Sequence, residues 1–395
     1  MKIFGSTLVA LTLLSATPLV AQDAKPSAGQ PVAAKPIEGY EPMVSAANLA
    51  PTAAIADPTA KVNVVGQPRA TQGHPCTLWD SEDIDHYKKM LETSKELQGQ
   101  VSALKAAMDK RITEPLGVPE PKLGPDGKKL FLGDQPPFNV PGSESYPKRN
   151  SNLSHDIRAL GMLYALTGEA KYGDYCKQIL LAYATAFPNY GYSPKSGWPS
   201  FHSAIDGRLQ NQFLEDAGWL IGVGFGYDLI YNLPSWTPQE RAMVHDNLFK
   251  PIVDDFRFER FKGTPYLNDP NNRSAMYVAA TLIAGYGTED PAMISDALYG
   301  VNGSKEKPTG GVFGTFYTSQ CISPDGLWAE TIGYQISLAG AAMIDQAEVL
   351  WHHDIDMYRY QNGLLYAEVP IMPRRGFGGP QMTAMLWQVL VRSSA

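Results

Sequence analysis

The feature that most limits the fold of this chain is a succession of helical patterns from about residue 81 to about residue 350. Apolar residues recur there at the three- and four-residue spacings of amphipathic helices. Convincing strand alternation is absent before roughly the last fifty residues of the sequence. The predicted helices cover 81–108, 153–166, 171–187, 209–233, 238–261, 272–286 and 290–298, and a last one follows the turn at 324–326 and runs to about 350.

Paired helices joined by loops favour an all-α fold of helical hairpins arranged side by side around an axis. A solenoid of repeats is the competing architecture, although the sequence shows no fixed repeat period. The tail at 358–395 is mixed and is expected to be short and irregular.

The first residues have the pattern of a secretory signal over 1–21, with Lys2, an apolar stretch and a small-residue cleavage site ending at Ala21. Residues 22–73 are rich in Ala and Pro and predict a linker or arm, which leaves 74–395 as the folded domain. Later segments are too short or too polar to cross a bilayer. We therefore expect a periplasmic or secreted protein with no membrane attachment after signal removal.

The net charge of −7 becomes −8 once the signal is removed, which argues against general nucleic-acid binding but allows an anionic ligand in a locally basic pocket. Three cysteines, Cys76, Cys176 and Cys321, permit one disulfide and one remaining thiol in an oxidising compartment. Cys176 lies in a helical pattern and is expected to be a small buried side chain. The cysteine spacing matches no metal site, and the sequence contains no cofactor motif.

Four clusters of polar and aromatic residues are candidates for chemistry, at 198–211, 268–274, 323–335 and 373–379. In the third, Glu330 and Tyr334 share one helix face with small residues, because they lie four positions apart. Such a face can line a cleft, although a core tyrosine with a hydrogen-bonded hydroxyl would give the same pattern.

The second and third clusters together resemble the alginate lyase group of polysaccharide lyases. The resemblance lies in Asn271-Asn272-Arg273-Ser274 before a small-residue helix and in Asp-Gly-Leu-Trp-Ala-Glu-Thr-Ile-Gly-Tyr-Gln at 325–335. It extends over roughly 150–350 and is nearest to the family-thirty-eight branch, whose members act on alginate and glucuronan. It implies an (α/α) toroid or incomplete barrel that cleaves β-1,4-linked uronic acid polymers by β-elimination.

The pattern departs from the group at one position. Related lyases often have a histidine where Arg273 stands, and that histidine is frequently the base for one substrate epimer. A histidine base from this motif is therefore in doubt. The β-sheet domain that follows the toroid in larger relatives would have no room after Ala395, so a catalytic residue from it is expected to be missing.

Elimination removes the proton on C5, beside a carboxylate, and expels the oxygen on C4. The carboxylate must be neutralised, and Asn272 with the fork of Arg273 suits that task. Tyr334 can take the proton and return one to the leaving oxygen, and nearby positive charge would favour its phenolate. His202 is the alternative proton carrier or carboxylate donor, and the sequence does not decide between His202 and Tyr334 as base.

Other residues are expected to contact the anionic polysaccharide: Arg208, Trp198, Tyr192, Glu330, Gln335, Arg374 and Arg375. The candidate residues, Asn272 and Arg273 included, also have structural alternatives. Asn272 could be only a helix cap, Arg273 could pair with a surface acid, the aromatic residues could anchor loops, and Glu330 more plausibly orients its neighbours. Asp254 and Asp255, with Glu259, hint at a metal cluster, but such acidic runs are usually solvated helix faces.

Two other classes of function fit the same helical pattern. An inverting glycoside hydrolase would use paired carboxylates from among Asp206, Asp216 and Asp228. A glycan-binding protein would use the same surface without catalysis. The preferred hypothesis is a monomeric polyuronate lyase, with the uronate epimer and the choice between internal and terminal cleavage left open.

Overall fold

The computed structural model describes residues 68–134, 144–193, 207–257, 265–316, 321, 328, 330, 338–358 and 360. They all belong to the larger of two compact units of the chain, Thr52–Ala395. Within these residues the structure is helical, with isolated bridges in place of strands. The α-helices are α1 (Ser81–Thr93), α2 (Lys95–Arg111), α3 (Tyr146–Thr167), α4 (Ala170–Ala186), α5 (Phe213–Leu229), α6 (Pro238–Val244), α7 (Lys250–Arg257), α8 (Asn272–Thr288), α9 (Pro291–Tyr299) and α11 (Gly340–Trp351).

Short 3-10 turns and π-helical turns join these helices. The 3-10 turns cover Leu132–Asp134, Phe187–Asn189 and Tyr266–Asn268, and the π-helical turns cover His245–Phe249 and Val312–Phe316.

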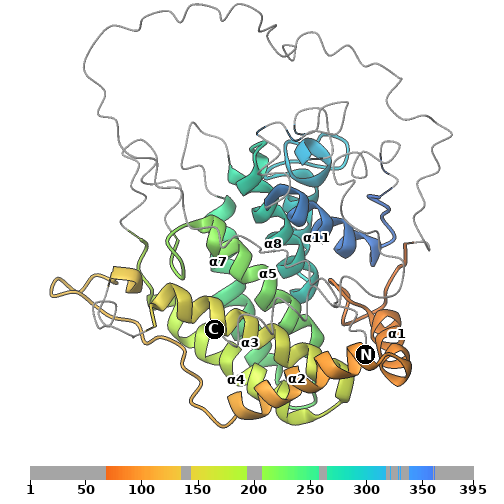
Figure 1. Ribbon diagram of the computed structural model, residues 1–395. Helices are drawn as coiled ribbons and strands as arrows, with labels where there is room; N and C mark the ends of the chain where they lie inside the picture. The colour runs from red at the N-terminus through yellow and green to blue at the C-terminus, as the bar shows by residue number, and fades with distance from the viewer. Residues whose placement is uncertain are drawn as a thin grey trace, which may run out of the picture. The chain divides into compact units, whose positions relative to one another are not determined.

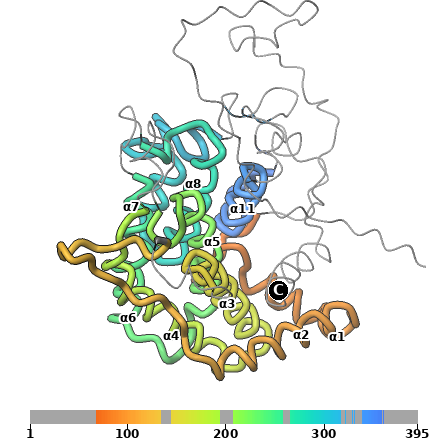
Figure 2. Tube along the Cα trace, turned by 60° about the vertical axis from the view of Figure 1, so that its left-hand side comes forward, coloured from red at the N-terminus to blue at the C-terminus, as the bar shows by residue number. Residues whose placement is uncertain are grey.

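Four helices, α3, α5, α8 and α11, run parallel and pack against one another in that order (Figures 1 and 2). Parallel neighbours need a connection that returns to the starting end, and α4, α6 with α7, and α9 supply it. This is the hairpin arrangement that the sequence predicts. The pairs that fix the direction are Ser154 with Gly222, Ile157 with Gly226, Gly218 with Met276, Gly224 with Ile283, Ala275 with Gln346, and Tyr286 with His353.

Helix α5 lies between α3 and α8 in this row, and its glycines let both of these helices approach closely. A Cβ atom on Gly226 would stand 2.6 Å from the carbonyl oxygen of Ile157 in α3. One on Gly224 would stand 2.6 Å from Cγ2 of Ile283 in α8. The two glycines therefore serve opposite sides of α5, which explains why a helix with so little charge is buried on nearly every face.

Several helix bounds differ from the sequence prediction for local reasons. The single helix expected over 81–108 is two helices, because Ser94 ends α1 and its side chain accepts from the N–H of Leu97 to cap α2. A π-helical turn at His245–Phe249 interrupts the helix expected over 238–261. The helix expected from residue 209 begins at Phe213 instead.

The segment that precedes α1 lies against the opposite end of the chain. The N–H of Arg69 donates to the carbonyl oxygen of Trp351 at 2.7 Å, and that of Thr71 donates to His352 at 3.0 Å. Residues 68–73 belong to the arm that the composition predicts. Two of them, Arg69 and Thr71, are hydrogen-bonded to the end of α11.

All three cysteines are buried free thiols, so the disulfide that their number permits is not formed. The burial of Cys176 in α4 confirms that prediction. Among the described residues, every helix is too short or too polar to span a bilayer.

Candidate active site

The starts of α3, α5 and α8 lie at the same end of the parallel row. Asn150, near the start of α3, donates through Nδ2 to the carbonyl oxygen of Leu209 at 2.7 Å, just before α5. The ring of Phe213, which begins α5, lies 6.3 Å from that of Tyr266, shortly before α8. Because a helix start carries partial positive charge on its unpaired N–H groups, this end of the fold favours anions.

The Asn-Asn-Arg-Ser motif forms the start of α8. The side chain of Asn271 caps the helix by accepting from the N–H of Ser274 at 3.0 Å. Asn272 is therefore the first helical residue and not the cap, and it is 6% exposed. The alternative in which Asn272 serves only as a cap does not hold.

One carboxylate oxygen of Glu330 joins this motif to the third cluster. Its Oε2 accepts from the backbone N–H of Asn272 at 2.5 Å and from Asn272 Nδ2 at 2.8 Å. The indole N–H of Trp328 donates to the same oxygen at 3.0 Å. Glu330 thereby orients the amide of Asn272, as the sequence suggests, and Trp328 is a partner that the sequence analysis missed.

The amide of Asn272 keeps binding capacity after this contact. A carboxamide has two N–H donors and one acceptor oxygen, and Glu330 takes one donor. Among the residues that the structure describes, none bonds to the other donor or to the amide oxygen. A fixed, buried amide with a spare donor at a helix start is suited to hold a carboxylate.

Arg273 follows Asn272 in the chain and brings a cation to the same helix start. Its side chain is exposed and has no ion pair with any described residue, so the expected pairing with a surface acid is not seen there. Asp269, just before the helix, is an acidic group at this helix start. Burial raises the pKa of Asp269, the charge of Glu330 raises it further, and a hydrogen bond from Asn271 opposes both.

Arg208 and Tyr192 meet at the same end, around a buried acid. The guanidinium of Arg208 lies 3.2 Å from Oδ2 of Asp255 and stacks over the Tyr192 ring at 4.3 Å. The Tyr192 hydroxyl donates to Asp255 Oδ1 at 2.7 Å. Asp255 thus neutralises Arg208, and a substrate carboxylate would have to compete with it. The expectation of a solvated helix face is therefore wrong at Asp255, which is buried, whereas Asp254 pairs with Lys250 and Arg257 on the surface.

The carboxylates that a hydrolase would need are engaged elsewhere. Asp216 accepts from the backbone N–H groups of Arg208 and Gln210 at 2.7 and 2.8 Å, and burial raises its pKa to about 7. Asp228 accepts three donors through Oδ2 from Cys76 and Thr77. The two lie in one helix, twelve residues apart, which is roughly 18 Å. Inverting hydrolases need about 6.5–9.5 Å, so this pair does not fit.

Several predicted site residues lie outside the described residues, so the structure leaves their placement open. They are Tyr334, His202, Trp198, Gln335, Arg374, Arg375 and the hydrolase candidate Asp206.

Two buried groups of His, Cys and Asp side chains could bind a metal ion. Both lie at the end of the helix row that is remote from Asn272. In the first, Asp80, Asp83 and His352 are already bonded to Arg69 and to one another. The second consists of His74, Cys76 and Asp228. Neither group is visible as a spacing in the sequence, because each combines residues from distant segments.

Comparison with known proteins places the chain near alginate lyases. No family model matches it. The chain is 26% identical over 263 residues to an exo-oligoalginate lyase of Saccharophagus degradans and 28% identical over 245 residues to an alginate lyase of Stenotrophomonas maltophilia. These matches cover 67% and 62% of the chain and 31% of each relative, so the chain spans about a third of the length of the curated relatives it matches.

Solved structures show the same likeness in the fold. An alginate lyase from Bacteroides ovatus superposes with a TM-score of 0.53 and 16% identity, covering 81% of this chain and 92% of that one. A tetrasaccharide complex of alginate lyase A1-III, an enzyme of Sphingomonas species A1, has a TM-score of 0.52 and 17% identity, covering 78% and 77%. The predicted all-α (α/α) toroid class is thereby confirmed.

Proposed function

We propose that this chain is a polysaccharide lyase that cleaves β-1,4-linked uronic acid polymers of the alginate type by β-elimination. The observation that carries the proposal is the contact of Asn272 with Glu330 at the start of α8. The names of the relatives, exo-oligoalginate lyase and alginate lyase, support the same class of substrate.

The first requirement of the reaction is to make the C5 proton acidic. A uronate carboxylate on the spare N–H of Asn272 would lie beside the positive start of α8 and the guanidinium of Arg273. These groups would stabilise the negative charge that moves onto the carboxylate as the C5–H bond breaks. Glu330 contributes by holding the amide in place, because its carboxylate would itself repel the substrate.

The second requirement is proton transfer. A base accepts the C5 proton, the C4–O bond breaks with its electrons on oxygen, and an acid protonates that oxygen, leaving a C4=C5 double bond. Tyr334 is the proposed base and acid, and its ordinary pKa of about 10 would fall beside Arg273. His202 remains the alternative base. Tyr334 lies in a segment that carries the sequence resemblance, whereas His202 is a candidate because it lies in an aromatic loop ahead of a predicted helix.

Glucuronan as an alternative substrate and the family-thirty-eight branch remain predictions, as do Arg208, Trp198, Tyr192, Gln335, Arg374 and Arg375 as sugar contacts. Export also belongs to the proposal, with residues 1–21 as its signal. Amino-terminal sequencing of protein recovered outside the cytoplasm would find Gln22 first if the signal is cleaved as predicted.

Incubation with alginate, polymannuronate and glucuronan tests the proposed reaction. A lyase would produce a near-ultraviolet absorbance from its unsaturated product together with new reducing ends. A hydrolase would produce reducing ends alone, and a glycan-binding protein would produce neither. Reducing ends without absorbance on every polymer would overturn the proposal.

A further inference from the structure

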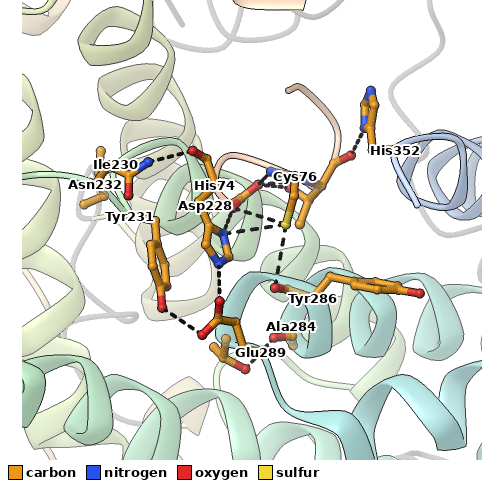
Figure 3. A network of polar contacts seen from close by, with 12 residues as sticks. His74, Cys76, Asp228, Ile230, Tyr231, Asn232, Ala284, Tyr286, Glu289 and His352 are labelled. Carbon is orange, nitrogen blue, oxygen red and sulfur yellow. Dashed lines mark hydrogen bonds and ion pairs between the residues drawn. The ribbon is translucent and has the colours of Figure 1, made fainter. Parts of the chain in front are cut away.

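The ends of α5 and α8 that lie away from the candidate active site hold a buried group of unlike ligand atoms (Figure 3). His74 and Cys76 come from the segment before α1, and Asp228 comes from the last turn of α5. The three side chains point toward one another, and each is at most 4% exposed. From these contacts we infer that His74, Cys76 and Asp228 form a structural binding site for a divalent transition metal, with Zn²⁺ as the best match.

The distances support a tetrahedral ion. Cys76 Sγ lies 3.6 Å from His74 Nδ1 and 3.9 Å from Asp228 Oδ1, and His74 Nδ1 lies 2.6 Å from Asp228 Oδ1. Tetrahedral zinc with thiolate, imidazole and carboxylate ligands has ligand–ligand edges of roughly 3.3–3.6 Å. To reach that range, the imidazole–carboxylate edge must open by roughly 0.7 Å and the thiolate–carboxylate edge must shorten by roughly 0.3 Å. The carbonyl oxygen of Tyr286, 3.8 Å from Sγ, or a water molecule can complete the coordination.

The groups around the three ligands hold them in the orientation that a metal site needs. Asp228 Oδ2 is occupied by the N–H groups of Cys76 and Thr77 at 2.9 and 2.8 Å and by the Thr77 hydroxyl at 2.7 Å. These donors leave Oδ1 directed at the histidine and the thiol. Ligating carboxylates in metal sites are hydrogen-bonded in this way.

The histidine has the outer contact that is characteristic of metal ligands. Its Nε2 faces Glu289 Oε1 at 3.5 Å, and its ring stacks on Tyr231 at 3.5 Å. A carboxylate on the second ring nitrogen favours the tautomer whose Nδ1 lone pair is free to bind a metal.

The charges of the three ligands also suit a divalent ion. A thiolate and a carboxylate together carry two negative charges, which a divalent ion neutralises. A soft thiolate beside imidazole and carboxylate, in tetrahedral geometry, favours zinc over magnesium or calcium.

Such an ion would tie the segment before α1 to the ends of α5 and α8. The inference does not depend on the proposed lyase activity, because the ligands lie at the ends of these helices that are remote from Asn272.

Metal titration of the full chain after chelator treatment tests the site, with Zn²⁺ and then Co²⁺ as probes. We expect one Zn²⁺ per chain and, with Co²⁺, an absorption band from thiolate-to-metal charge transfer. Cys76→Ala should lose the band and weaken Zn²⁺ binding at least 100-fold. Glu289→Gln should weaken binding by about 10–100-fold.

Cys176→Ala is the matched control, because Cys176 is also a buried thiol but bonds only to the carbonyl oxygen of Ile157 among described residues. It should keep both the band and the affinity. Wild-type protein without stoichiometric Zn²⁺ or without the charge-transfer band would overturn the inference, whether or not the variants fold. Equal binding by a folded Cys76→Ala variant would also overturn it.

Discussion

At the scale of single residues, the candidate active site depends on one carboxylate oxygen and the N–H groups that donate to it. Glu330 is exposed, yet its Oε2 accepts from the buried residues Asn272 and Trp328. The sequence resemblance places Asn272 and Glu330 in one site, but it does not predict which of them holds the other. That relation depends on the path of the chain between residues about sixty apart, which local pattern does not encode.

Glu330→Ala is expected to lower the free energy of unfolding by about 1–3 kcal/mol, because three N–H groups of Asn272 and Trp328 lose their acceptor. It should also lower kcat/KM on the cleaved polymer by roughly 100-fold, since Asn272 is no longer held. Denaturant unfolding and the absorbance assay measure the two effects. Glu330→Gln, which keeps an acceptor oxygen, should show smaller losses. Glu120→Ala, on an exposed glutamate, should stay within about 0.5 kcal/mol of wild type.

Asp216 should make stability depend on pH. Its folded pKa of about 7 lies above the ordinary value near 3.9, so the folded state binds the proton more tightly. The resulting stabilisation is complete below about pH 4 and is lost as the pH rises through about 7, at up to about 1.4 kcal/mol per pH unit. Asp216→Asn should remove this slope in unfolding experiments between pH 4 and pH 8. An unchanged slope would show that Asp216 is ionised throughout that range.

At the scale of helices, the fold depends mainly on the close packing of α5 against its neighbours. The sequence predicts that these segments are helical because their apolar periodicity is a local property. It does not predict the break at Ser94 or the late start of α5, because both depend on hydrogen bonds between particular side chains and the backbone. Asp254 and Asp255 show the same limit, since adjacent residues on a helix point about 100° apart.

Gly226→Ala tests the contact of α5 with α3. The added methyl group would meet backbone atoms of Ile157 that have no room to move, so we expect a loss of about 3 kcal/mol. Gly99→Ala is the matched control, because a Cβ atom at that position in α2 meets nothing within 4 Å. It should raise stability by about 0.5–1 kcal/mol. Equal effects of the two changes on the unfolding midpoint would contradict the packing argument.

At the scale of the whole molecule, the segment before α1 joins the beginning of the folded unit to its last described helix. Composition alone suggests an arm up to residue 73, because Ala and Pro carry little information on tertiary contacts. Arg69 nevertheless lies 2.8 Å from Asp80 and 3.2 Å from Asp83, and its backbone bonds to Trp351.

Arg69→Met should therefore destabilise the whole unit by about 3 kcal/mol, because two buried carboxylates lose their cation. Lys88→Met is the control, since Lys88 is exposed in α1 and its side chain has no hydrogen bond or ion pair with any residue that the structure describes. A thermal unfolding series of both variants would measure the difference. Equal melting temperatures would mean that Arg69 is dispensable for closing the fold.

In the proposed reaction, the phenol of Tyr334 acts beside Asn272 and Arg273 to carry out β-elimination on a uronate polymer. The most direct test compares wild type with Tyr334→Phe on alginate, following the near-ultraviolet absorbance of the product, with unfolding curves to show that both are folded. We expect rapid absorbance growth for wild type and a loss of at least about 1,000-fold for the folded variant. A folded Tyr334→Phe protein with full activity would contradict this proposal.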